Sequence, residues 1–428
     1  MKILMLIHRF PYPPVRGDCI RSWGEVEFLS RQHDVWLACV DRVAPWPVHV
    51  ARARRCCRDV AVVVRAERAS LVHGAASLLL GHSVSEGYFY DKRLAAVLRR
   101  WDRTVGFDAI LTFSPAMAPY AALVRAKRRV LDMNDVESDR WLSYAERSVP
   151  PLSWLYALEA WRLEKAETGW VRGHDISLLV NDCERSKLPA ELRERTAVVR
   201  TGVDLTRYDV RRDGAGQVTV PREPVVGFLG SMAYPPNVRA VNWFGQSVWP
   251  QIKRSVPEAR WLIVGRRPTR AVRGWARQPG VTVTGYVEDV RPLLRAMRVF
   301  VCPVREQIGV QTKLIEALAA ARAAVVTPAV AAGIDCDDPP PFMVAASPGE
   351  FAEAVVRLLR DEAQARALAL RARTVAEANY SAEDQVRRIE HWLEGNRPDD
   401  MRALPREAVA LAQPCDLAVA AGHEVVGL

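Results

Sequence analysis

The chain has 428 residues, of which 49% are hydrophobic and 26% are charged. This length suits two domains better than one, and the composition allows each domain to bury a core. No apolar run approaches the ~20 residues of a membrane span, so an integral membrane protein is excluded. The eight cysteines show no C-x-x-C or Cys/His spacing, so we expect reduced thiols and no metal site.

The net charge is +10, and arginines gather in the N-terminal half of the chain. The clusters are Arg52, Arg54, Arg55 and Arg58, then Arg99 and Arg100, then Arg125, Arg128 and Arg129. A basic surface attracts anionic lipid or nucleic acid, and the alternative is a solvated arginine-rich face. No nucleic-acid-binding module accompanies the charge, so we expect no nucleic-acid partner. We expect a cytoplasmic protein that can contact the anionic inner face of the cell membrane.

The first elements in chain order are predicted to be strand, loop, helix and strand. Residues 2–7 (KILMLI) form a strand, and the proline-rich segment HRFPYPPVRGD that follows is not helical. Gly17 lets a ligand approach the backbone, and Asp18 is predicted to be the N-cap of a helix through about Arg31. Residues 35–40 form the next strand. The opening lacks G-x-G-x-x-G, so a nicotinamide or flavin site is disfavoured.

Short apolar strands alternate with helices through the rest of the first 204 residues. The strands are predicted at 60–64, 109–113, 130–133 and 176–180, and the main helices at 88–101 and 152–171. This alternation predicts a doubly wound parallel sheet. The segment LDMNDVESDRW, residues 131–141, places four carboxylates between a strand and a helix. Such a loop can orient hydroxyls or bind a metal, or it can cap the helix through Ser138 or Asp139.

A second series of strands and helices follows a segment without apolar periodicity. Strands are predicted at 225–229, 261–264, 281–284, 299–302 and 324–327, with helices at 237–253, 289–297 and 311–321. Residues 351–393 have a helical pattern with a break near Tyr380. The predicted fold class is α/β, with two Rossmann-like doubly wound parallel-sheet domains facing a cleft, followed by C-terminal helices. Such interfaces between domains favour ligand binding.

The predicted boundaries follow from these changes of pattern. They are an N-terminal domain at 1–204, a linker at 205–224, a C-terminal domain at 225–380, a C-terminal helix at 381–395 and a tail at 396–428. The linker carries charges, glycine and proline. The tail has weak patterning and several prolines, so we expect it to be disordered.

The helix at 311–321 lies between two strands, and its first turn indicates a ligand site. The strand-helix-strand order makes the strands parallel, so a ligand should lie at their carboxyl ends beside the helix N-terminus, which favours phosphate. Lys313 can neutralise a diphosphate, and Glu316 can accept hydrogen bonds from ribose hydroxyls. The alternative is a surface salt bridge between these two residues on one helix face.

Several motifs in order resemble those of known enzymes. The C-terminal half resembles family 4 retaining glycosyltransferases of the GT-B fold, through GFLGSMAYPPNVRAVNWF (227–244), LIVGRRP (262–268), VTVTGYVEDVRPLLRAM (281–297) and GVQTKLIEALA (309–319). The N-terminal half is similar to the PEP-CTERM-associated sugar transferases of exopolysaccharide synthesis, through HRFPYPPVRGDCIRS (8–22), FSPAMAPY (113–120) and LDMNDVESDRW (131–141). Their order and spacing make the set more specific than any one motif.

The resemblance implies a nucleotide-sugar donor held mainly by the C-terminal domain. Its donor-binding residues would be Gly230, Ser231, Asn237, Arg266, Gln311, Lys313, Leu314 and Glu316. Gly17 belongs to a loop that faces the donor phosphates, so Lys313 and Gly17 are the predicted catalytic residues. The expected acceptor side contains His8, Asp18, Arg21, Asp135 and Ser138. No cofactor is expected besides the nucleotide-sugar co-substrate.

The chain departs from the family pattern near the donor helix. The spacing of the family's paired glutamates, counted back from Glu316, falls on Ile308, and Glu306 is out of register. Thr201 stands where many relatives carry asparagine. The sequence therefore leaves the donor sugar undefined.

The resemblance implies a retaining hexosyltransferase that acts on a saccharide or lipid-linked acceptor in bacterial exopolysaccharide biosynthesis. Charge developing on the leaving phosphate would be stabilised by Lys313, the helix N-terminus and the Gly17 loop. Two alternatives stay open: a nucleotide-sugar epimerase or hydrolase on the same scaffold, and a non-catalytic scaffold of a polysaccharide assembly. The presence of both Lys313 and Glu316 argues against the second alternative.

Overall fold

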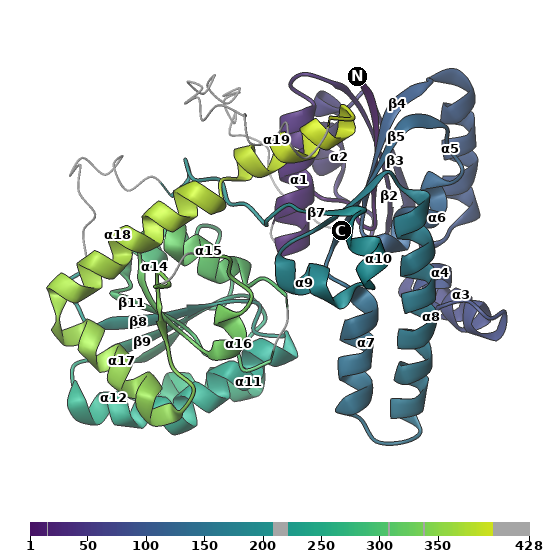
Figure 1. Cartoon of the computed structure of the whole chain (residues 1–428). Helices are drawn as coiled ribbons and strands as arrows, with labels where there is room; N and C mark the ends of the chain where they lie inside the picture. Colours follow the sequence, from purple (N-terminus) through teal and green to yellow (C-terminus); the bar gives the residue numbers. More distant parts are fainter. Residues whose placement is uncertain (15, 209–220, 307–308, 337–338, 397–428) are drawn as a thin grey trace, which may run out of the picture.

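The computed structural model describes residues 1–14, 16–208, 221–306, 309–336 and 339–396 (Figure 1). Nearly all of the predicted tail at 396–428, and most of the predicted linker at 205–224, lie outside these ranges. The described chain forms two α/β domains side by side, each built on one parallel sheet. The predicted fold class is therefore confirmed.

Seven parallel strands form the N-terminal sheet, in the order β3-β2-β1-β4-β5-β6-β7. They are β1 (Lys2–Ile7), β2 (Asp34–Asp41), β3 (Asp59–Val64), β4 (Phe107–Phe113), β5 (Ala126–Asn134), β6 (Ile176–Leu179) and β7 (Thr196–Val198). The helices are α1 (Gly17–Leu29), α2 (Pro47–Cys56), α3 (Glu67–Leu79), α4 (Val84–Phe89), α5 (Lys92–Thr104), α6 (Ala118–Ala121), α7 (Glu137–Glu146), α8 (Leu152–Gly173), α9 (Asp182–Lys187) and α10 (Ala190–Arg193). Every strand predicted here forms, and the short β7 was not predicted.

Six parallel strands form the C-terminal sheet, in the order β10-β9-β8-β11-β12-β13. They are β8 (Val225–Leu229), β9 (Arg260–Val264), β10 (Val281–Val283), β11 (Val299–Cys302), β12 (Ala323–Val326) and β13 (Met343–Val344). The helices are α11 (Pro235–Trp243), α12 (Trp249–Ser255), α13 (Arg270–Gly274), α14 (Arg291–Ala296), α15 (Thr312–Ala319), α16 (Pro328–Ala331), α17 (Pro348–Arg360), α18 (Glu362–Asn379) and α19 (Ala382–Leu393). The two-residue β13 was not predicted.

The long C-terminal helical region has two breaks rather than the one expected. The break near Tyr380 is confirmed, because α18 ends at Asn379 and α19 begins at Ala382. The second break lies at Asp361, whose side chain accepts a hydrogen bond from Gln364 N and caps α18.

The last helix belongs to the N-terminal domain although it follows the C-terminal one. Figure 1 shows α18 leaving the C-terminal domain and α19 crossing back over α1. Val386, Ile389 and Trp392 of α19 join the hydrophobic core under the N-terminal sheet. His33 Nε2 also lies 2.7 Å from Glu390 Oε1. The chain therefore passes from the N-terminal domain to the C-terminal domain and returns through α18 and α19, so two covalent connections join the domains.

Helices α7 and α8 form a hairpin that is locked by one buried carboxylate. Glu167 of α8 accepts hydrogen bonds from Glu137 N at 2.8 Å and from the Ser138 hydroxyl. This carboxylate satisfies the first N–H groups of α7, so the predicted capping by Ser138 or Asp139 is wrong. Burial raises the pKa of Glu167 to about 8.

We predict that Ile389→Ala destabilises the N-terminal domain, although Ile389 lies far from it in sequence. The side chain is fully buried in that core, so its truncation should lower the free energy of unfolding by about 2–5 kcal/mol. Urea denaturation followed by circular dichroism measures this change. Asp384→Ala, an exposed position on the same helix, is the control. An equally small effect of both substitutions would contradict the packing of α19.

We predict that Glu167 makes stability decrease as pH rises. Folding raises the pKa of this carboxyl from 4.5 to about 8, so the folded chain holds the proton more tightly than the unfolded chain. Its stabilisation is complete below pH 4.5 and is lost as the pH rises through the folded value. Free energies of unfolding for wild type and Glu167→Gln across this pH window test the sign. A difference that does not change with pH would refute the prediction.

Candidate active site

The carboxyl edges of the two sheets lie where the two domains meet. Strand order reverses between β1 and β4 in one sheet and between β8 and β11 in the other, and ligands of such sheets bind at these points. A Cβ on Gly17, at the start of α1, would lie 3.3 Å from Thr312 Oγ1 at the start of α15. A Cβ on Gly309 would lie 2.8 Å from Asp135 Oδ1. The N-termini of α1 and α15 therefore approach each other where the two domains meet, and we call this region the cleft.

Polar contacts beside this cleft hold the two domains in their relative position. Asn181 Nδ2 donates to the Gly333 carbonyl at 3.3 Å, and Arg200 pairs with Asp335 at 3.1 Å. The Tyr380 hydroxyl donates to the Asp335 carbonyl at 3.0 Å. The first two bonds link loops of the two domains, and the third lies within the C-terminal domain and holds the loop at Asp335 in place.

Lys313 stands in the first turn of α15 with two amide partners. Its Nζ donates to Asn237 Oδ1 at 2.7 Å and to Gln311 Oε1 at 3.1 Å, and it lies 5.0 Å from the centre of the Phe228 ring. Burial lowers the pKa of the ammonium. Among the described residues, both hydrogen-bond acceptors of this ammonium are neutral. The site therefore presents a part-buried positive charge that an anion can neutralise.

The loops after β8 and β9 pack closely to hold Asn237 in place. Asn237 is buried, and its Nδ2 donates to the Ser231 carbonyl at 3.1 Å. A Cβ on Gly230 would lie 2.6 Å from Asn237 Nδ2, and one on Gly265 would lie 1.7 Å from the Gly230 carbonyl oxygen. Only glycine allows both approaches. Arg266 follows on this loop, where its carbonyl accepts from Met232 N.

Glu316 has a partner that the sequence did not reveal. The Tyr208 hydroxyl donates to Glu316 Oε1 at 2.7 Å. Burial raises the pKa of Glu316 and also that of Tyr208, which the adjacent carboxylate raises further. Lys313 and Glu316 thus take different partners, and the salt bridge considered as the alternative does not form between them in the described structure. The Leu314 side chain is buried in the core, so only its backbone can serve the site.

Asp18 is the charged centre of the N-terminal side. Helix α1 begins at Gly17 with Arg16 as the N-cap residue, so the predicted N-cap role of Asp18 is wrong. The carboxylate instead lies 2.9 Å from Arg9 Nε and 3.4 Å from His8 Nε2. Burial would raise the pKa of Asp18, but the His8 hydrogen bond and the Arg9 charge outweigh it and hold the pKa far below its ordinary value. The carboxylate is therefore ionised and firmly oriented.

Two further acceptor-side candidates lie inside the N-terminal domain. Arg21 is buried, and its guanidinium donates to Asp132 at 2.8 Å, to Glu25 at 3.2 Å and to the Val199 carbonyl. Ser138 is buried as well and donates to Glu167 (see above). The structure does not bring these two side chains together with Asp18, and their acceptor role stays a prediction.

The remaining acceptor-side candidate faces the C-terminal domain. Asp135 approaches Gly309 across the cleft and pairs with Arg140 at 2.8 Å. Glu306, the glutamate out of register, pairs with Arg239 at 2.5 Å. Ile308 lies outside the described residues. Within those residues, no group of three His, Cys, Asp or Glu side chains could hold a metal ion.

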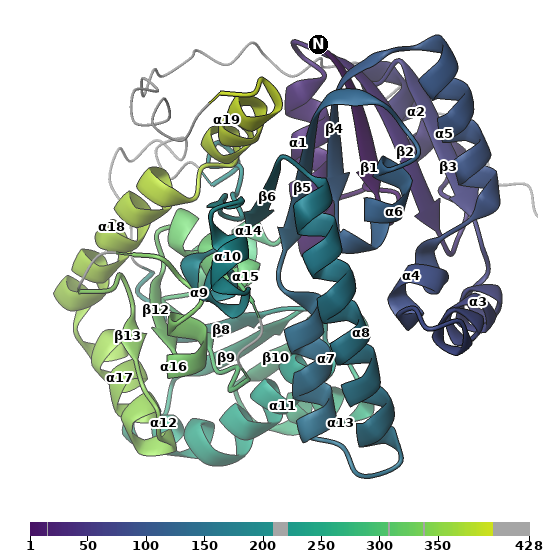
Figure 2. The ribbon, with the colours of Figure 1, turned by 45° about the vertical axis from the view of Figure 1, so that its right-hand side comes forward.

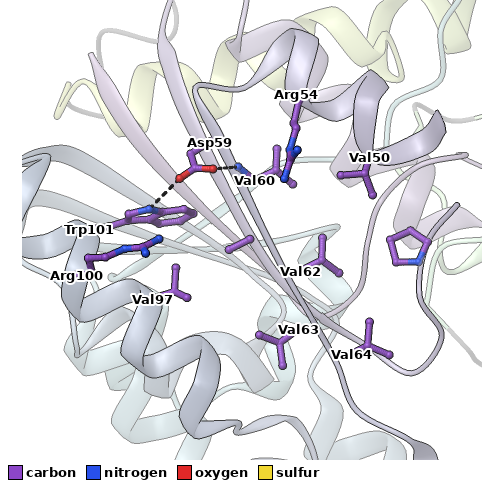
Figure 3. Close-up of a pocket in the computed structure, with 12 residues that line it drawn as sticks. Val50, Arg54, Asp59, Val60, Val62, Val63, Val64, Val97, Arg100 and Trp101 are labelled. Carbon is purple, nitrogen blue, oxygen red and sulfur yellow. Dashed lines mark hydrogen bonds between the residues drawn. The ribbon is translucent and has the colours of Figure 1, made fainter. Parts of the chain in front are cut away.

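A separate groove of about 510 Å³ runs along the edge strand β3 (Figure 3). Figure 3 shows valine side chains of β3 beside Trp101, whose indole N–H donates to Asp59 at 3.1 Å. No residue lining this groove belongs to the cleft described above. We place the candidate active site in the cleft, because Lys313 and its amide partners Asn237 and Gln311 converge there.

Comparisons with known proteins identify a family resemblance in the C-terminal domain. Residues 223–361 match the family model described as glycosyl transferases group 1. No curated protein matches the chain.

Solved structures resemble the chain over nearly its whole described length. HepE from Anabaena in complex with UDP has 14% identity and a TM-score of 0.62, covering 92% of this chain and 100% of that one. Sucrose-phosphate synthase from Thermosynechococcus elongatus has 15% identity and a TM-score of 0.64, covering 92% and 98%. A glycosyltransferase from Rickettsia africae has 12% identity and a TM-score of 0.59, covering 92% and 98%. The chain therefore has the GT-B fold, and residues 223–361 form its part similar to glycosyl transferases group 1.

Proposed function

We propose that the protein is a glycosyltransferase that moves a hexosyl group from a nucleotide-sugar donor to a hydroxyl of a saccharide or lipid-linked acceptor, with retention. The observation that carries this proposal is the part-buried Lys313 ammonium, held by two neutral amides at the N-terminus of α15. A diphosphate would accept charge-assisted hydrogen bonds from this ammonium. The family model over residues 223–361 and the UDP bound in the HepE structure support a nucleotide-sugar donor.

The donor would lie across the start of α15. Its diphosphate would meet Lys313, the free N–H groups of that helix and the backbone of the loop after Gly230. The ribose would lie one turn further on, at Glu316, where Tyr208 occupies one carboxylate oxygen and orients the other. Arg266 stands on the neighbouring loop, within the part of the site that would receive the base or phosphate. We expect no cofactor besides the donor itself.

The reaction would be driven by electrostatic stabilisation of the leaving group. As the bond from the sugar C1 to the phosphate oxygen breaks, negative charge grows on the departing diphosphate, and the acceptor oxygen forms its bond to C1 on the same face. The acceptor proton passes to the leaving phosphate. Lys313, the α15 N-terminus and the N-terminus of α1 at Gly17 would all stabilise the charge that develops.

The acceptor would approach from the N-terminal domain. Asp18 and Asp135 offer carboxyl oxygens that can accept hydrogen bonds from hydroxyl groups, and His8 lies against Asp18. The sequence resemblance to family 4 and to PEP-CTERM-associated transferases supports exopolysaccharide biosynthesis in bacteria as the setting.

We predict that a thermal-shift panel of nucleoside diphosphates and nucleotide sugars identifies the donor. A true ligand at a hundredfold excess over its Kd should stabilise the chain by about 2.7 kcal/mol. Incubation with the donor alone should give only slow hydrolysis, which separates a transferase from a hydrolase or epimerase. If no nucleotide stabilises the chain, the donor site is not formed by these residues.

We predict that Lys313→Ala and Glu316→Gln affect different kinetic constants. Lys313→Ala should lower kcat by about 10²–10³-fold, because the charge it meets grows in the transition state. Glu316→Gln should mainly raise KM, by about tenfold, because it weakens the bonds to the ribose hydroxyls. A 2′-deoxyribose donor should lose much of its disadvantage in this variant.

The matched control for these variants is Lys127→Ala, since Lys127 is an exposed lysine paired with Asp108 on the N-terminal domain. It should leave both constants unchanged. Melting temperatures of all variants separate lost activity from lost folding. Wild-type kinetics in Lys313→Ala would refute the proposed donor site.

We predict that Gly17→Ala impairs transfer without unfolding the chain. The added Cβ would stand 3.3 Å from Thr312 Oγ1, in the space between the two helix N-termini where the diphosphate would lie. Gly24→Ala on the same helix meets no atom within 4 Å and is the control. It should be neutral or slightly stabilising, because alanine favours helix over glycine. Equal activity of the two variants would place the diphosphate elsewhere.

A further inference from the structure

Helix α3 buries its small residues and exposes its large ones. Ser70, Gly74 and Ser77 are buried on the face toward α4, and a Cβ on Gly74 would lie 2.8 Å from Val84 Cγ1. Leu79 and Leu80 are 88% and 77% exposed, and Leu71 and Val72 are exposed as well. A helix of a water-soluble domain normally does the reverse. The exposed apolar face therefore indicates that α3 packs against another surface, which would bury these side chains.

Helix α8 repeats this pattern on its outer face. Trp154 and Trp161 are 70% and 52% exposed, and Leu155 and Leu158 between them are also exposed. Trp154, Leu158 and Trp161 recur at helical spacing and form one stripe. Lys165 continues the stripe, with its Nζ 3.6 Å from the centre of the Trp161 ring.

The two apolar helices are held rigidly beside each other. Glu159 of α8 accepts hydrogen bonds from Val84 N at 2.6 Å and from Ser85 N at 3.0 Å, at the start of α4. Arg162 donates to the carbonyls of Leu78 and His82 at the end of α3. Figures 1 and 2 both show the α3–α4 and α7–α8 hairpins projecting beyond the same end of the N-terminal sheet. The exposed apolar side chains of α3 and α8 thus belong to one fixed part of the molecule, which we call the α3/α8 surface.

We propose that the α3/α8 surface docks on a phospholipid bilayer with anionic headgroups. Its length and composition fit the headgroup region: α3 has 13 residues, about 20 Å, which is too short to span a bilayer. No described helix is long and apolar enough to cross a membrane. Exposed tryptophans beside leucines are the side chains that settle at a membrane–water interface.

The charges around the α3/α8 surface complement an anionic bilayer. From Ala69 to Ser85 the chain carries no Asp, Glu, Lys or Arg, so the charges of α3 are confined to Glu67 and Arg68 in its first turn, away from Leu79 and Leu80. The exposed charged residues of α8 are Glu164, Lys165 and Arg172, and Glu146 and Arg147 are exposed just before it. The cations outnumber the carboxylates by three to two, so the rim of an inserted apolar face can meet lipid phosphates.

The arginine clusters noted in the sequence are less suited to this role. Arg52 pairs with Glu27 at 2.8 Å and Arg58 with Asp34 at 2.6 Å. Arg125 pairs with Asp102 at 3.1 Å. Carboxylates therefore offset part of their charge, and insertion of the apolar side chains becomes the main source of affinity. Docking needs no sugar transfer, so this inference goes beyond the proposed function and can fail or hold independently of it.

Vesicle flotation of the full chain tests the docking. Wild type should float with vesicles of phosphatidylcholine and phosphatidylglycerol, more weakly with phosphatidylcholine alone. Leu80→Ser and Trp154→Ser/Trp161→Ser should each weaken partitioning by about tenfold or more, because each removes apolar area from the inserted face. Leu370→Ser, an equally simple change at an exposed leucine of α18 (48% exposed), is the matched control and should bind as wild type does.

A second measurement keeps the proposal testable if the serine variants fold poorly. Brominated lipids should quench part of the wild-type tryptophan fluorescence, and Trp154→Phe/Trp161→Phe, which keeps the apolar area, should bind vesicles but lose that part of the quenching. Equal flotation of all variants, or no flotation of wild type, would overturn the proposal. So would a Leu80-dependent dimer in solution, measured by sedimentation in the absence of vesicles, because the surface would then be covered by a second copy.

Discussion

The Lys313 ammonium, a positive charge held by neutral amides at the start of a helix, is the interaction on which the rest of the site depends. Asn237 can hold Lys313 only because Gly230 and Gly265 let two loops pass within contact distance. The charge therefore has a defined position, and burial lowers the pKa of the ammonium. Glu316 interacts with this charge electrostatically but takes Tyr208 as its hydrogen-bond partner. The opposite wall of the cleft supplies a second helix N-terminus at Gly17, which adds to the same field.

The arrangement of the domains serves this cleft in two ways. The bonds around Asp335 join the domains beside the site, and α19 carries the chain back to pack under the N-terminal sheet. The cleft is thus closed at one side by polar contacts and spanned by a helix at another. The α3/α8 surface belongs to the N-terminal domain, and the proposed acceptor side of the cleft lies on the same domain. A bilayer-bound enzyme would meet a lipid-linked acceptor at that side.

Much of this could be read from the sequence because the signals are local. The strands of both sheets are short apolar runs, and the motifs place Lys313 and Asn237 in the first turns of two helices of one domain. β7 and β13 were missed because segments of three and two residues carry no pattern. Asp18 was assigned as a cap from its residue type alone, whereas its ion pairs with His8 and Arg9 depend on how the chain folds.

The features that the sequence could not predict were mainly contacts between polar residues that lie far apart in the chain. Arg21 bonds Asp132, which lies 111 residues away, and Tyr208 reaches Glu316 across 108 residues. Neither spacing carries a local signal. The inverted pattern of α3 is also invisible without the structure, because the sequence shows apolar and small residues but not which of them face solvent.

The most direct measurement of the central claim is a crystal structure of the chain with a nucleoside diphosphate bound. The account predicts the diphosphate at the N-terminus of α15, with a phosphate oxygen within hydrogen-bond distance of Lys313 Nζ and facing Gly17, and the ribose beside Glu316. A nucleotide bound in the β3 groove or elsewhere, with Lys313 still held only by Asn237 and Gln311, would contradict it.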